Sequence, residues 1–158
     1  MARTRGLVNL SHWHVLIEGL QAAPKEFYTS VEAAIAKRLI PGASLSRLDW
    51  PEGGILSAKR EYLRVSRKPY LFDICGAPFG TGFFVSWWLN ESFGCLAALP
   101  GLERFFRRST YYRVDTALMF QEAVSKAVVD VVDGMTEAKG LRMLSELERK
   151  PILRDLLR

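Results

Sequence analysis

The clearest pattern along the chain lies between residues 57 and 89, where three runs rich in aromatic and β-branched side chains are separated by two turn signals. These signals are Arg67-Lys68-Pro69 and the glycine-rich segment 76–82. Proline presets the φ angle of a turn, and glycine supplies positive φ. The pattern predicts an antiparallel meander with strands at about 57–67, 70–76 and 82–89, and with a long hairpin loop before the third strand.

The second and third predicted strands are apolar on both faces. Phe72 and Ile74 share one face while Leu71 and Cys75 lie on the other, and the run 83–89 is apolar throughout except for Ser86. A strand with one wet face alternates apolar and polar residues, so both faces of these strands must be covered by helices or by a partner. A weaker signal at 43–55 predicts one further strand at the edge of the sheet.

Helical spacing of apolar residues occurs in the remaining parts of the chain. It predicts a short helix at 9–20, a clearer one that Pro24 opens and Pro41-Gly42 stops, and a long one that Asp115 or Thr116 caps and Gly140 ends. The tail predicts one or two short amphipathic helices broken near Pro151, with Ser145 and Glu148 in a capping-box pattern.

These elements predict one α+β domain covering residues 1–158. A central antiparallel meander of three to four strands packs against an N-terminal helix and a long C-terminal helix. We expect residues 1–10 to be frayed and residues 141–158 to form the short helical tail.

Composition is that of an ordinary globular protein, with 49% hydrophobic and 25% charged residues. The two cysteines, Cys75 and Cys95, lie in apolar surroundings, which predicts reduced core thiols in a cytoplasmic protein. The first ten residues carry positive charge but no apolar run, so they predict no signal peptide. The net charge of +5 concentrates in 59–68 and 104–113, and a bias of this size is more typical of solubility than of nucleic-acid binding.

Candidate catalytic and metal-binding residues are few. His12 and His14 could chelate a metal only on an extended backbone, and on the predicted helix they diverge by about 200°. Asp73 is the only charge in its apolar run, which predicts an ion pair with Arg60 or Arg64. A carboxylate so close to Cys75 opposes thiolate formation. We therefore predict no catalytic residue, no metal site and no cofactor.

The segment 93–113 carries the strongest functional signal. An apolar run at 93–102 is too short to span a bilayer, and four aromatic residues interleaved with four arginines follow at 103–113. Such a combination is typical of an interfacial membrane anchor, because rings sit at headgroup depth and arginines meet anionic lipid. It also suits single-stranded nucleic acid. A third interpretation is a connector with core aromatics and solvated arginines.

The sequence favours a non-enzymatic interaction module that is self-associating, binds another protein, or is peripheral to an anionic membrane. The alternative is a nucleic-acid binder that uses six arginines, and an enzyme comes third. Those arginines are Arg60, Arg64, Arg104, Arg107, Arg108 and Arg113. The candidate interaction surface comprises Phe79, Trp88, Phe93, Arg104, Phe105, Phe106, Arg107, Arg108, Arg113, Leu153, Leu156 and Leu157.

Overall fold

The computed structural model of the chain describes residues 7–51, 59–92 and 110–154. The elements are β1 (Leu7–Glu18), α1 (Pro24–Ala36), β2 (Ser44–Pro51), β3 (Lys59–Arg67), β4 (Tyr70–Phe79), β5 (Gly82–Ser92), α3 (Tyr111–Ala138) and β6 (Ile152–Leu153). The strands form one antiparallel sheet with the order β2-β3-β4-β5-β1-β6. The α+β fold with an antiparallel sheet is confirmed, and this sheet has six strands where three to four were predicted.

The meander β3-β4-β5 and the edge strand β2 lie where the sequence predicts them. The predicted long hairpin loop at 76–82 is wrong, because β4 continues to Phe79, which pairs with Gly82. Only Gly80 and Thr81 remain as the turn. Gly80 has a φ of 59°, a conformation that glycine adopts without strain.

The predicted helix at 9–20 is also wrong, since this segment is β1 and pairs with β5. Trp13, Val15 and Ile17 are buried, whereas His14 and Leu16 between them are exposed. This alternation is the period of a strand with one covered face. Residues 7–10, which were expected to be frayed, belong to the same strand.

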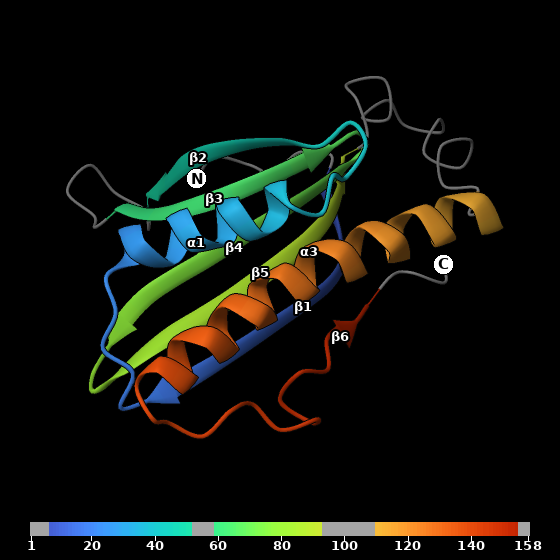
Figure 1. The fold of residues 1–158 in the computed structure, drawn as a ribbon. Coiled ribbons are helices and arrows are strands. Elements are labelled where there is room, and N and C mark those ends of the chain that lie inside the picture. The colour runs from blue at the N-terminus through green and yellow to red at the C-terminus, as the bar shows by residue number, and fades with distance from the viewer. Residues whose placement is uncertain (1–6, 52–58, 93–109, 155–158) are drawn as a thin grey trace.

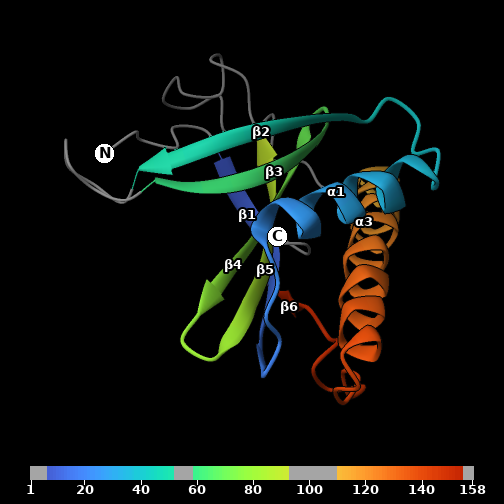
Figure 2. The ribbon, with the colours of Figure 1, turned by 60° about the vertical axis from the view of Figure 1, so that its left-hand side comes forward.

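Both helices cover the same face of the sheet (Figure 1), which we call the inner face. Phe27 and Val31 of α1 and Phe120 and Val124 of α3 join the inner-face side chains of the strands in one buried cluster. Figure 2 shows β2 and β3 bending over α1. The opposite face is the outer face, whose central part consists of alternate residues of β1 and β5: His12, His14, Leu16, Phe84, Ser86 and Trp88.

The Tyr28 side chain of α1 joins two strands where their pairing ends. The ladder between β3 and β4 stops at Leu63 and Ile74. Beyond it the Tyr28 hydroxyl donates a hydrogen bond to the Glu61 carbonyl at 2.6 Å and accepts one from the Gly76 N–H at 3.1 Å. The hydroxyl therefore satisfies backbone groups that the separated strands leave open.

The ends of α3 follow from capping chemistry. Thr110 is the N-cap, and its side chain accepts a hydrogen bond from the Arg113 N–H, so the predicted caps at Asp115 and Thr116 placed the start too late. Gly140 follows the last turn with a φ of 66°, as predicted for a helix stop. Thr110 replaces the later caps because its side chain satisfies one of the first free N–H groups of a longer helix.

The predicted helical tail at 141–158 is wrong over its described part. Residues 146–149 form a turn, and β6 pairs with Ser11 and His12 of β1. The Ser145–Glu148 capping pattern is nevertheless present, because the Ser145 N–H donates to the Glu148 carboxylate and the Glu148 N–H donates to Ser145 Oγ. The reciprocal bonds close a turn that no helix continues, because Pro151 follows within three residues.

Candidate functional site

Much of the predicted interaction surface lies outside the described residues, as does Cys95. This applies to Phe93, Arg104, Phe105, Phe106, Arg107, Arg108, Leu156 and Leu157. The members that the structure describes are Phe79, Trp88, Arg113 and Leu153, and they come from four different elements. The fold does not bring these four side chains together in one patch.

The first two described members lie far apart on the β4–β5 hairpin. Phe79 is 68% exposed and ends β4 beside the turn, whereas Trp88 is 38% exposed on the outer face. Trp88 lies six positions beyond Gly82, the partner of Phe79, which corresponds to about 20 Å along a strand. Leu153 is exposed in β6 at the far edge of the sheet, opposite Ser11.

Arg113 fixes the start of α3 against the end of β5. Its guanidinium forms an ion pair with Glu91, and its carbonyl accepts a hydrogen bond of 2.9 Å from the Tyr70 hydroxyl. Ser92, the last residue of β5, is held by a hydrogen bond from its N–H to the Pro69 carbonyl. The two chain ends that flank segment 93–109 are therefore anchored side by side.

Exposed apolar side chains collect on α3 on both sides of Arg113 in the sequence. Tyr111 and Tyr112 are 92% and 78% exposed, and Leu118 and Met119 one heptad later are exposed as well. A spacing of seven residues is about two helical turns, so Tyr111 aligns with Leu118 and Tyr112 with Met119. We call these four residues the α3 patch. The sequence signal was ambiguous, because Leu118 also fitted the core-facing stripe of the helix.

The outer face carries a row of side chains across four strands. His12, Trp88, Asp73 and Arg64 are successive cross-strand partners in the register. The Arg64 guanidinium donates two hydrogen bonds to the Asp73 carboxylate, at 2.6 and 2.8 Å, which confirms the predicted ion pair. The pairing raises the pKa of Arg64. Both oxygens of the Asp73 carboxylate are therefore engaged by Arg64.

Cys75 lies in the next row of the outer face and is fully buried. Burial raises the pKa of its thiol, so the protonated form dominates at neutral pH. Among residues 7–51, 59–92 and 110–154, no group of three or more His, Cys, Asp or Glu residues could hold a metal ion. The side chains that interact with the Cys75 thiol are Arg60, Tyr62 and Tyr28.

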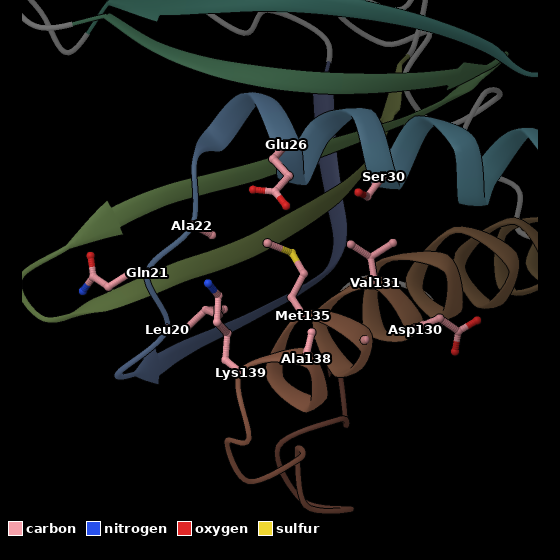
Figure 3. Close-up of a pocket in the computed structure, with 11 residues that line it drawn as sticks. Leu20, Gln21, Ala22, Glu26, Ser30, Asp130, Val131, Met135, Ala138 and Lys139 are labelled. Carbon is pink, nitrogen blue, oxygen red and sulfur yellow. The ribbon is translucent and has the colours of Figure 1, made fainter.

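A shallow groove of about 370 Å³ runs between α1 and α3 (Figure 3). Leu20, Val131 and Met135 contribute apolar lining, while Glu26 and Lys139 project from the two opposite sides. A neighbouring hollow continues along both helices and is lined by Arg38 and Asp130. The Arg38 guanidinium and the Asp130 carboxylate form an ion pair across it, with 2.6 Å between nitrogen and oxygen. The lining of the groove contains neither histidine nor cysteine.

Neither of the two described helices, α1 and α3, carries a stretch long and apolar enough to cross a bilayer. No protein-family model, no curated protein and no solved structure matches the chain.

Proposed function

We propose that the protein is a cytoplasmic, non-enzymatic interaction module that associates with anionic membrane surfaces through segment 93–113 and the α3 patch, which share Tyr111 and Tyr112. The observation that carries the proposal is the high exposure of Tyr111 and Tyr112, which directly precede Arg113 and its ion pair with Glu91. Tyrosine is enriched at membrane–water interfaces because its ring is apolar and its hydroxyl is polar.

The sequence of the adjoining segment supports the same proposal. It supplies the apolar run 93–102 and the arginines Arg104, Arg107 and Arg108 immediately before the α3 patch. A basic residue near an anionic bilayer contributes about 1 kcal/mol to binding, and this contribution is screened by salt. Apolar insertion adds a contribution that salt does not screen.

Self-association is a second candidate, favoured by Leu118 and Met119. These residues place exposed apolar surface on a regular helix, and a second copy of the chain could cover it in a symmetric dimer. The nucleic-acid alternative has less support, because Arg64 and Arg113 are held in ion pairs with Asp73 and Glu91. Phosphate contacts would have to compete with these pairs.

Vesicle flotation tests the proposal. The full chain is mixed with phosphatidylcholine vesicles with or without phosphatidylserine, at low salt and at about 0.5 M salt. At the higher concentration, interactions between charges are screened beyond a few ångströms. We expect flotation with anionic vesicles that weakens but persists at high salt. Light scattering over a range of concentrations reports self-association separately. A chain that stays monomeric and ignores both vesicle types would contradict both candidates.

A further inference from the structure

The two histidines of the chain lie together on the outer face of β1, next to Trp88. Their rings have centroids 6.2 Å apart and planes within 7° of parallel. The His12 ring also stacks on Trp88, with 4.7 Å between the centroids. His12 and His14 share a face because residues two apart on a strand point the same way. The extended backbone that a His-x-His chelate needs is therefore present.

The ring spacing suits a shared metal ion. A transition-metal ion lies about 2.0–2.1 Å from an imidazole nitrogen, hence about 3.2 Å from the ring centre. Two rings on one ion consequently have centroids up to about 6.4 Å apart. The observed 6.2 Å lies just inside that limit, so the two rings must approach each other by about 1 Å to share an ion at the bent angle of a tetrahedral site.

His12 has an unsatisfied nitrogen. It is only 8% exposed, and its Nδ1 is buried without a hydrogen-bond partner. A buried polar atom of this kind is uncommon, and a lone pair left free is a donor for a metal ion. His14 is exposed and leaves the pair open to solvent.

We propose that His12 and His14 form a two-histidine site for a divalent transition-metal ion such as Ni²⁺, Cu²⁺ or Zn²⁺. Imidazole nitrogen suits these ions, with Cu²⁺ bound most tightly of the three. The described residues offer no third ligand of the usual kinds, so water completes the coordination. The positive charge of Arg154 opposes the incoming cation and limits the affinity.

Calorimetric titration with Ni²⁺ tests the site, because the chain contains no other histidine. We expect one ion per chain, and His14→Gln should weaken binding by at least about tenfold because the chelate is lost. His14 is exposed, so this variant should keep the fold. Leu16→Gln, two positions further along the same face, is the matched control and should leave the affinity unchanged. Equal affinity of the wild type and His14→Gln, or no binding by the wild type, would overturn the proposal.

Fluorescence gives an independent measurement. Cu²⁺ held by His12 would lie close to the Trp88 ring and should quench its emission. Trp88→Phe should abolish most of the quenching while Ni²⁺ still binds. Quenching that is the same in His14→Gln as in the wild type would place the ion elsewhere and contradict the proposal.

Discussion

A Cβ atom on Gly76 would lie 2.3 Å from Cδ1 of Phe27, so β4 must have glycine where α1 presses its first aromatic ring against the sheet. Phe27 is fully buried, and its ring also meets that of Phe83 edge to face with centroids 5.6 Å apart. The neighbouring Tyr28 hydroxyl accepts a hydrogen bond from the Gly76 N–H. This contact sets how closely α1 approaches β4.

Gly76→Ala should destabilise the protein by about 1–3 kcal/mol, because the ring or the strand has to move in a close-packed core. Phe27→Leu in the same chain should recover part of that loss by removing the clashing ring atoms. Gly134→Ala is the control, since a Cβ there meets nothing within 4 Å. It should stabilise α3 by about 0.5–1 kcal/mol. Urea unfolding curves measure all of these changes, and a harmless Gly76→Ala would contradict the packing argument.

Asp73→Asn should destabilise the fold by about 3 kcal/mol, because the largely buried Arg64 loses its counter-charge. Asp130→Asn is the matched control. Asp130 also pairs with an arginine at 2.6 Å, but its side chain is 68% exposed, so the loss should be below about 1 kcal/mol. Thermal unfolding of both variants would show whether burial of the ion pair decides how much stability is lost. Equal decreases in the melting temperature of the two variants would count against a role for burial.

Acid should release the turn at 145–149 from the sheet. Hydrogen bonds from Arg142 and Ser145 lower the pKa of Glu148 from 4.5 to about 2. A lowered folded-state pKa contributes stability that is complete above about 4.5 and is lost as the pH falls towards 2. Trp13 Nε1 donates a hydrogen bond to the Glu148 carbonyl, so its fluorescence reports the release.

Glu148→Gln should remove that transition between pH 4.5 and 2, because the side chain no longer titrates. Glu146→Gln, in the same turn, is the control and should keep it. An identical acid response in Glu148→Gln and the wild type would assign the transition to another group.

Cys75 should be unreactive towards thiol reagents at neutral pH, because it is buried and its thiol pKa is raised. A Cys95→Ser background isolates its response. We expect labelling at the rate of unfolding, so that denaturant accelerates it strongly. Rapid labelling of the native protein would contradict this result and would restore an enzymatic interpretation of the Asp73–Cys75 pair.

The meander could be predicted because its turns and strands are local in sequence. β1 could not, since its partner β5 is about 70 residues away. The apolar residues at 10, 13, 16, 17 and 20 fit a helix, yet Leu16 is 44% exposed while Val15 faces the core. Long-range pairing overrode the local periodicity. β6 was missed for the same reason, because it pairs with residues at the other end of the chain.

The candidate surfaces were predictable to a similar degree. The Asp73–Arg64 pair followed from one charge in an apolar strand. Tyr111 and Tyr112 lay within the predicted aromatic–arginine run, but their exposure depends on the helix starting at Tyr111. The predicted helix gives the histidine pair no metal-binding geometry, because the two side chains diverge on a helix. A strand at that position reverses the geometric argument.

The measurement that tests membrane association most directly is flotation of three proteins on the same phosphatidylserine-containing vesicles. The proteins are the wild type, Tyr111→Ser with Tyr112→Ser, and Phe79→Ser. Phe79 is a matched exposed aromatic about 30 Å along β5 from the Glu91–Arg113 anchor. We expect the tyrosine variant to lose most of its flotation at 0.5 M salt, and Phe79→Ser to float like the wild type. Equal flotation of all three proteins, or a loss confined to Phe79→Ser, would contradict it.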